Sequence, residues 1–194
     1  MHLAPITLTG DAVRLEPLSL DHHAALSEVG LDPALWRWTN VRVATPEDMR
    51  AYIEEALRLR DAGSALPFAT IDRASGRVVG CTRYGNIDAP NRKLEIGWTF
   101  VAPAWQRTRI NTEAKFLMLR HAFETLGCIR VELKTHARNE ASRRAIARIG
   151  AREEGTLRNH MICPDGSFRD TVYFSVIESE WPGVKAALLA KLKR

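Results

Sequence analysis

The chain has 194 residues, with 28 Lys and Arg against 23 Asp and Glu, and 45% of its residues are hydrophobic. This size and balance exclude a wholly disordered chain. They predict a single domain over residues 1–194, with a core at about 11–178 and a C-terminal helix at about 182–193. A chain of this length buries roughly 70% of its unfolded surface, so it needs no disulfide or metal to fold.

The sequence shows no signal for a membrane, secreted or metal-binding protein. No apolar run approaches the roughly 18 residues of a membrane helix, and the first residues lack a basic stretch followed by an apolar one. Cys81, Cys128 and Cys163 lie far apart without a Cys-x-x-Cys pair, and the histidines have no metal-ligand spacing. We therefore expect a cytoplasmic protein with no bound metal and no membrane contact.

The formal charge of +5 and the pI near 9.4 raise the question of nucleic-acid binding. The excess is small and is spread along the chain, without a basic helix stripe or an aromatic platform. A specific nucleic-acid partner is therefore not expected.

Apolar periodicity, helix caps and turn residues predict the elements of one domain. In chain order they are strand 12–18, helix 20–29, helix 45–59, strand 66–72, strand 77–84, strand 93–102, helix 112–126, strand 128–135, helix 139–149, strand 152–161, strand 168–176 and a helix from about 182. An antiparallel meander thus leads into a β-α-β-α unit and two further strands. The fold class is α+β, or mixed α/β, with helices on both faces of one sheet.

The segment 105–115 joins a strand to a helix that we expect Asn111 or Thr112 to cap. A helix start presents free N–H groups and a positive end, and Arg107 and Arg109 add guanidinium groups suited to phosphate oxygens. One interpretation is a pyrophosphate site, and the other is an ordinary capped helix with solvated arginines. The glycine-rich dinucleotide and P-loop motifs are absent from the sequence.

A second strand–helix junction follows, where Asn139 fits the N-cap and Ser142 the third helical position. The order of these junctions resembles the GCN5-related N-acetyltransferase (GNAT) superfamily. The resemblance is narrower to the ribosomal-protein N-acetyltransferase branch, the RimJ/RimL type. The segments that carry it are Leu94–Trp98, Asn111–Lys115, Asn139–Ser142, Glu153–Arg158 and Arg169–Ser175.

This resemblance implies a six- or seven-stranded sheet whose fourth and fifth strands, here 93–102 and 128–135, splay apart to admit acetyl-CoA. Pantetheine would pair with backbone groups near Phe100, Val101 and Ala102, and Asn139 would orient it from the other side. The pyrophosphate would meet the loop formed by Gln106, Arg107, Thr108, Arg109, Ile110, Asn111 and Thr112.

Two positions depart from the family pattern. The loop glycines are replaced by Arg109 and Asn111, so either the loop takes another path and arginine side chains bind the phosphates, or cofactor affinity falls; we favour the first. The family's tyrosine near the sulfur is replaced by Ile146, which leaves Ser142 as the candidate proton donor to the thiolate. Its alternative role is that of a first-turn helix residue.

Direct acetyl transfer in a ternary complex needs a base for the amine and N–H groups for the oxyanion. Glu95 is the first candidate base, with His160 and Asp170 as alternatives; Glu95 could equally face solvent or pair with Arg92 or Lys93. His160 is also assigned to the acceptor site. Trp36 and Trp38 either line that site or belong to the core.

The leading hypothesis is an acetyl-CoA-dependent N-acetyltransferase that acts on a protein N-terminal α-amine, as a monomer or homodimer. The alternatives are acetylation of a small amine (an antibiotic, polyamine or amino-acid derivative) and a non-catalytic binding module with the same fold.

Overall fold

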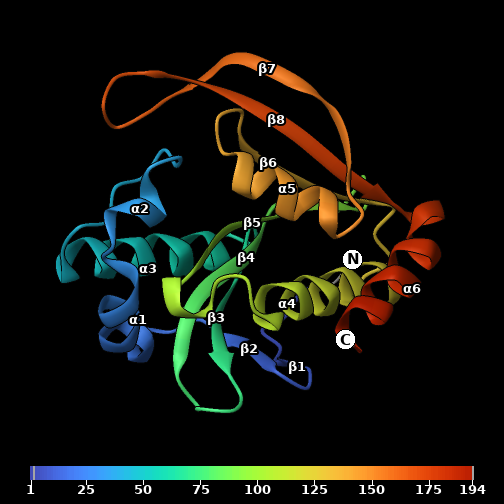
Figure 1. Ribbon diagram of the computed structural model, residues 1–194, viewed down its shortest axis with the longest axis horizontal. Coiled ribbons are helices and arrows are strands. Elements are labelled where there is room, and N and C mark those ends of the chain that lie inside the picture. The colour runs from blue at the N-terminus through green and yellow to red at the C-terminus, as the bar shows by residue number, and fades with distance from the viewer. Residues whose placement is uncertain (2, 194) are drawn as a thin grey trace.

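The computed structural model describes residue 1 and residues 3–193 as one mixed sheet with helices packed on it (Figure 1). The strands are β1 (Leu8–Thr9), β2 (Val13–Pro17), β3 (Leu66–Asp72), β4 (Val78–Asp88), β5 (Lys93–Val101), β6 (Arg130–His136), β7 (Arg152–Ile162) and β8 (Phe168–Ile177). Their order in the sheet is β1-β2-β3-β4-β5-β6-β8-β7. Only the β5–β6 pair is parallel within this sheet of described residues.

Helices cover both faces of the sheet. They are α1 (His23–Gly30), α2 (Pro33–Trp36), α3 (Pro46–Asp61), α4 (Arg109–Arg120), α5 (Glu140–Arg148) and α6 (Trp181–Leu192). Apolar residues of α4 and α6 pack with the strands in one core cluster, whereas those of α1 and α3 pack on the other face in a second cluster. The β7–β8 hairpin extends beyond this body and arches over α5 (Figure 1).

The α+β class and the seven predicted strands are confirmed, and the sheet gains an eighth strand. That strand, β1, has two residues, too few for a periodic pattern, so the expected six or seven strands was an undercount. The four-residue helix α2 was missed for the same reason. No described helix is long and apolar enough to cross a membrane.

Helix α4 begins three residues earlier than expected, at Arg109. Its N-cap is Thr108, whose side chain accepts a hydrogen bond from the Ile110 N–H at 3.3 Å. The prediction of Asn111 or Thr112 as the cap was therefore wrong: Thr108 is also a good cap residue, and it stands first along the chain. The helix then widens into a π turn at His121–Thr125 before β6.

Strands β5 and β6 separate soon after they meet, as expected for the two splaying strands. They pair in parallel at Lys93, Leu94 and Glu95 of β5, which face Arg130, Val131 and Glu132 of β6. Beyond Glu95, β5 continues to Val101 and β6 to His136 without further pairing between them. The two strands therefore stop pairing beyond Glu95. The interval between them, here called the opening, has Glu95 at its apex and leads along β5 toward the start of α4.

A β-bulge at Trp98 changes which side chains of β5 face each side of the sheet. Arg83 of β4 pairs with Gly97, and Cys81 pairs with Phe100. Between these two pairs β5 therefore has one residue more than β4. Trp98 takes up the extra residue with φ 49°. As a result Ile96 packs in the cluster with α4, whereas Phe100 packs in the cluster with α3.

Candidate active site

The loop before α4 reaches the helix without a glycine. Arg107 takes the left-handed conformation with φ 61°, and Thr108 is extended before the helix begins at Arg109. Arg109 and Asn111, which stand at the family's glycine positions, are helical residues and need no left-handed backbone. The loop thus takes its turn two residues before the first expected glycine position, with the turn strain at Arg107.

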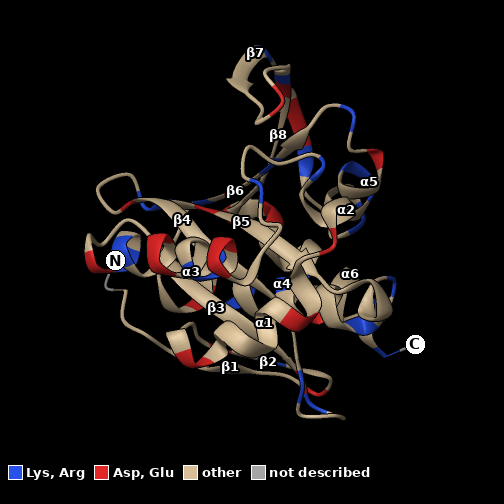
Figure 2. Cartoon of the chain, turned by 90° about the vertical axis from the view of Figure 1, so that its left-hand side faces the viewer, with Lys and Arg blue, Asp and Glu red and all other residues tan. Residues whose placement is uncertain are grey.

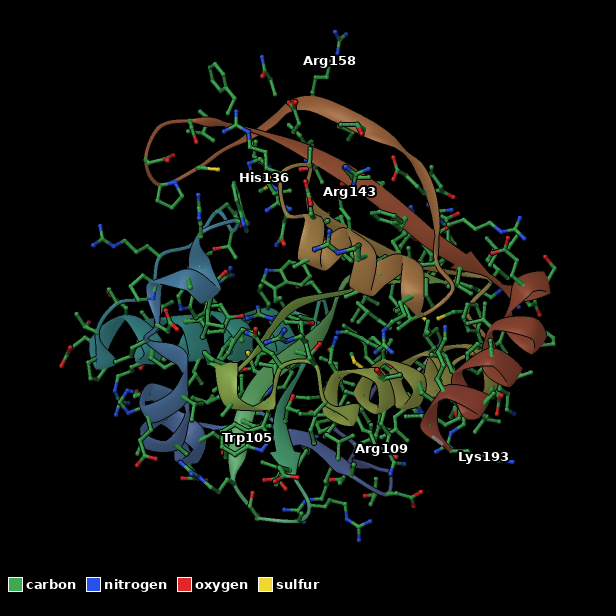
Figure 3. The ribbon with its side chains drawn as sticks, viewed as in Figure 1. Trp105, Arg109, His136, Arg143, Arg158 and Lys193 are labelled. Atoms are coloured by element: carbon green, nitrogen blue, oxygen red, sulfur yellow. The ribbon has the colours of Figure 1, made fainter. Side chains whose placement is uncertain are left out.

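A strongly basic pocket of about 570 Å³ lies at this helix start. Its lining comes from α4, α5 and the end of α6, and consists of Arg107, Thr108, Arg109, Asn111, Thr112, Arg144, Ala145, Arg148, Lys191 and Leu192. Figure 2 shows basic residues on α5 and near the end of α6, and Figure 3 shows Arg109 beside that end. No carboxylate lines the pocket within the described chain, so its field favours an anion.

Contacts among the pocket residues hold its walls together. The Arg109 guanidinium donates to the Leu192 carbonyl at 2.7 Å, and the Arg148 guanidinium donates to the Thr112 hydroxyl. The Lys191 ammonium in turn donates to the Arg148 carbonyl. Helix α6, which the sequence places far from the loop, is therefore part of the wall, and periodicity alone could not have indicated this.

One polar atom in this pocket has no partner. The side-chain oxygen of Asn111 is buried without a hydrogen bond, the only such buried side-chain atom in the described residues. A buried acceptor without a hydrogen bond destabilises the fold, so this oxygen is expected to receive a hydrogen bond from a bound ligand. A ligand that fits this pocket therefore offers both anionic groups and a hydrogen-bond donor.

The other residues expected to hold the cofactor occupy different places. The Gln106 amide donates to the Val101 carbonyl at 2.9 Å and is outside the pocket lining, so it fixes the end of β5. Phe100, Val101, Ala102 and Ile110 all have buried side chains. Several of their backbone groups are also bonded within the fold: the Val101 carbonyl accepts from Gln106, the Ala102 N–H donates to the Val79 carbonyl, and the Ile110 N–H donates to Thr108.

Asn139 and Ser142 lie at the opposite wall of the opening, at the start of α5. Asn139 is the N-cap, as predicted, and its side-chain oxygen accepts a hydrogen bond from the Ser142 N–H at 3.1 Å. The Asn139 amide nitrogen and the Ser142 hydroxyl are not used in this cap.

Glu95 lies at the apex of the opening and is 2% exposed. Its carboxylate accepts a hydrogen bond from the Asn86 side-chain amide at 2.7 Å and forms an ion pair with Lys134 of β6 at 2.9 Å. It bends over Gly97, where an added Cβ would stand 2.8 Å from its Oε1. The alternatives of a solvent-facing Glu95, or one paired with Arg92 or Lys93, are therefore wrong.

Around Glu95 the sheet carries a cluster of cations and aromatic rings that sequence reasoning missed. The Arg83 guanidinium lies 5.2 Å from the centre of the Trp98 ring, and the Lys134 ammonium lies 5.7 Å from the rings of both Trp98 and Tyr173. Arg83 is 3% exposed. Its position in the middle of a strand whose other residues from Val78 to Gly85 are all uncharged was the available signal, because charged residues are seldom buried in a sheet unless they are paired.

His136, at the end of β6, borders this cluster and was also missed. Its ring meets that of Trp38 at 5.0 Å, and it lies beneath the β7–β8 hairpin (Figure 3). Burial lowers its pKa, and nearby Arg169 and Arg138 lower it further. Nδ1 accepts the Arg138 N–H at 3.1 Å, so in the neutral ring Nε2 carries the proton.

The residues expected at the acceptor site divide between core and opening. Trp36 is a core residue: it is 8% exposed, its indole N–H donates to the Gly30 carbonyl at 2.7 Å, and it packs against Tyr52 and Phe100. The prediction that Trp36 lines the acceptor site was therefore wrong. Trp38 instead faces His136 at the opening.

His160 lies on the β7–β8 hairpin over the same sheet face. Its Nδ1 is 3.1 Å from the Thr171 hydroxyl, and its ring meets that of Tyr173 at 5.8 Å. Asp170, the other alternative base, accepts a hydrogen bond from the Asn159 N–H at 2.7 Å. Among the described residues, no group of His, Cys, Asp and Glu side chains is arranged to hold a metal ion.

Known proteins with a related sequence or fold are acetyltransferases of one family. A family described as "Acetyltransferase (GNAT) domain" matches residues 12–152. The chain belongs to the GNAT acetyltransferase family. The resemblance inferred from its motifs is thereby confirmed.

Solved GNAT structures share its fold over nearly the whole chain. A GCN5-related N-acetyltransferase from Brucella melitensis is 37% identical, with a TM-score of 0.90 over 98% of this chain and 86% of that one. Mycobacterium smegmatis RimJ, in complex with CoA-disulfide, is 25% identical, with a TM-score of 0.81 over 97% of this chain and 93% of that one.

A curated relative carries the ribosomal name. YdaF of Bacillus subtilis (strain 168), named provisionally as a ribosomal N-acetyltransferase, is 36% identical over 110 residues. That match spans 57% of this chain and 59% of YdaF, less than two thirds of either protein. These relatives are consistent with the RimJ/RimL-type branch.

Proposed function

We propose that this chain is an acetyl-CoA-dependent N-acetyltransferase that transfers the acetyl group directly to the N-terminal α-amine of a protein. The observation that carries the proposal is the opening between β5 and β6. It runs from Glu95 at its apex toward the basic pocket at the start of α4. One elongated ligand with phosphates at one end and a reactive group at the other suits such a path.

The residues present fit acetyl-CoA. Arg109, Arg144, Arg148 and Lys191 supply cations for its phosphates, and the α4 start supplies N–H groups. The unpartnered Asn111 oxygen accepts from one of the donors that the cofactor carries. The unpaired edge of β5 beyond Glu95 offers backbone groups to the amides of the pantetheine arm.

When bound, acetyl-CoA supplies an activated acetyl thioester, and the chain must provide a base, an oxyanion site and a proton. Glu95 takes the amine proton, directly or through a water molecule. Backbone N–H groups near the Trp98 bulge stabilise the negative charge that develops on the carbonyl oxygen. As the C–N bond forms, the C–S bond breaks, and the Ser142 hydroxyl donates a hydrogen bond to the departing thiolate. The thiolate then takes up a proton from water, and Glu95 releases its own to water.

His136 does not serve as the base in this scheme. Its Nδ1 is occupied by the Arg138 N–H, and its Nε2 carries the proton in the neutral ring. With its pKa lowered, the ring stays neutral at pH 7 and acts as a donor. Glu95 is therefore the proton acceptor at the apex.

A protein N-terminus is favoured as acceptor by the relatives: YdaF carries a ribosomal N-acetyltransferase name, and RimJ shares the fold. The test is CoA release in the presence of acetyl-CoA, measured separately with N-terminal peptides and with small amines such as polyamines and aminoglycosides. We expect faster release with peptides. Faster release with the small amines would replace this acceptor by the alternative one.

The basic pocket yields a prediction on cofactor affinity. Arg109→Ala and Arg148→Ala should each raise KM for acetyl-CoA about tenfold, because each removes a charge-assisted contact to phosphate. Raising the salt concentration should weaken acetyl-CoA binding more in the wild type than in the variants. Arg158→Ala, on an exposed residue that points away from the body (Figure 3), is the control and should leave KM unchanged.

A further inference from the structure

The sheet face at Glu95 holds more buried positive than negative charge. Arg83 and Lys134 lie beside Glu95, and Arg169 lies further along β8, two residues from Thr171, which pairs with His136 at the end of β6. Glu132, opposite Glu95, is already paired with Arg130. Arg83 is 3% exposed and Arg169 is 7% exposed. Of these cations only Lys134 has an acidic partner in the described chain, so two guanidinium groups are buried without a carboxylate.

Arg169 is the less well satisfied of the two arginines. Its Nε donates to the Thr171 hydroxyl at 3.1 Å, and within the described residues its guanidinium forms no salt bridge and stacks on no aromatic ring. Arg83, by contrast, lies between the rings of Tyr52 and Trp98. A buried guanidinium loses its contacts with water, and only an anion or several hydrogen-bond acceptors can replace them. Arg169 therefore has N–H donors that are free to bind a ligand.

If the proposed function is right and Glu95 is the base, the acceptor amine lies on this sheet face, with Arg83 and Lys134 beside Glu95 and Arg169 near the end of β6. Glu95 marks the apex of the opening, and His160, Trp38 and Tyr173 border the same face. Positive neighbours lower the pKa of an amine and so favour the neutral form that attacks the thioester. The same neighbours repel a purely cationic acceptor such as a polyamine, which would need a site lined by carboxylates.

We propose that the acceptor of this enzyme carries a carboxylate close to its amine, and that Arg169 binds this carboxylate, with Arg83 adding to the positive field. The inference rests on the proposed acetyltransferase function and defines its substrate class. The carboxylate comes either from a free α-amino acid or from an acidic residue at a peptide N-terminus. Both present an anion within a few bonds of the amine, which the planar guanidinium of Arg169 matches.

The test compares matched acceptors that differ only in this charge. One pair is a C-terminally amidated peptide that begins with Asp and the same peptide that begins with Asn. The other is a free amino acid and its α-amide. We expect kcat/KM for the carboxylate member of one pair to exceed that of its amide by about 10- to 100-fold, and the pair that shows this identifies the source of the carboxylate.

Variants assign the preference to Arg169. Arg169→Gln should bring the carboxylate-to-amide ratio close to one through the KM for the acceptor, with the KM for acetyl-CoA unchanged, and Arg169→Lys should restore part of the ratio. Arg158→Gln removes the same charge from the same hairpin at an exposed position and should leave the ratio intact. A purely structural role of Arg169 would instead change both KM values.

Three results would overturn the inference. Equal rates within both pairs would show that no carboxylate is recognised, and an equal loss of preference in Arg158→Gln would show a general charge effect. Binding of acetyl-CoA without transfer to either carboxylate acceptor would exclude this substrate class while leaving the cofactor site standing. A protein that does not bind acetyl-CoA at all would instead refute the proposed function itself.

Discussion

Replacing Glu95 by glutamine is expected to lower kcat by about 10²- to 10⁴-fold, while the KM for acetyl-CoA stays close to that of the wild type. Glutamine keeps the size of the side chain and can still accept the hydrogen bond that Asn86 donates. It cannot take a proton from the amine. Steady-state CoA release at saturating acceptor measures the effect, with calorimetric binding of acetyl-CoA as the check on the cofactor site.

Two further variants separate proton transfer from ion pairing. Glu95→Gln leaves the Lys134 ammonium without its carboxylate, which destabilises the fold by an amount on the order of 3 kcal/mol. The double variant Glu95→Gln/Lys134→Gln removes that unpaired charge. If the double variant regained kcat, Glu95 would be a structural partner of Lys134 and its assignment as the base would be wrong.

Glu132→Gln is the matched control for the loss of a carboxylate. Glu132 lies directly opposite Glu95 in the β5–β6 register, and its carboxylate pairs with Arg130 at 2.8 Å. It has no role in the proposed chemistry. Its replacement should therefore leave kcat within about twofold, as expected for a site outside the proton path.

Lys115→Met is expected to stabilise the protein at pH 7. Lys115, on α4, is 6% exposed, and its ammonium donates to the Thr82 hydroxyl at 3.0 Å and the Thr99 hydroxyl at 2.6 Å. No carboxylate within the described residues pairs with it, and burial lowers its pKa to about 7. Methionine fills the same space without a charge, and the two threonine hydroxyls still bond to each other at 2.7 Å.

The sign of the pH dependence follows from that lowered pKa. Between pH 7 and pH 10.5 the unfolded chain holds the Lys115 proton while the folded chain loses it, so the wild type becomes more stable as the pH rises. The destabilisation is greatest below pH 7, where both states are protonated. Between pH 7 and pH 9, the free energy of unfolding of the wild type should rise by about 2 kcal/mol relative to Lys115→Met.

Urea unfolding of both proteins at several pH values measures this difference. Subtracting the two curves removes the contribution of buried thiols and phenols such as Cys81 and Tyr84, whose raised pKa values act in the opposite direction at higher pH. Lys193→Met, at an exposed position, is the control and should run parallel to the wild type. Parallel curves for Lys115→Met as well would show that Lys115 keeps its usual pKa in the fold.

Local patterns predicted the elements that position the site, because caps and periodicity act over a few residues. Asn139 and its helix follow from a cap residue before an apolar stripe, and the parallel strands follow from the alternation of strands and helices. The start of α4 was misplaced because Thr108 and Asn111 are both good caps and lie close together. Only the packed structure decides between them.

The surroundings of Glu95 could not be predicted in the same way, because they depend on register. The ion pair with Lys134 exists because β5 and β6 run in register at Glu95 and Glu132, two residues before Lys134. The bulge at Trp98 then moves that ring onto the face of Arg83, against the simple alternation of a strand. Neither effect leaves a trace in composition or periodicity.

The tryptophans show the same limit in side-chain burial. Trp36 and Trp38 are two residues apart in a segment of weak pattern, and the sequence favours core and cleft equally for both. In the structure Trp36 turns inward and bonds to the Gly30 carbonyl, whereas Trp38 turns toward His136. Trp36 also packs against Phe100 and Trp38 against His136, and these partners lie far from the two tryptophans in the chain.

Calorimetric titration of the wild-type protein with acetyl-CoA tests the central claim most directly, because the opening between β5 and β6 and the basic pocket are assigned to this one ligand. We predict saturable binding with micromolar affinity, and weaker binding in Arg109→Ala and Asn139→Ala. A folded protein that gives no heat with acetyl-CoA or CoA, and no rise in melting temperature, would contradict the assignment of this opening as an acetyl-CoA site.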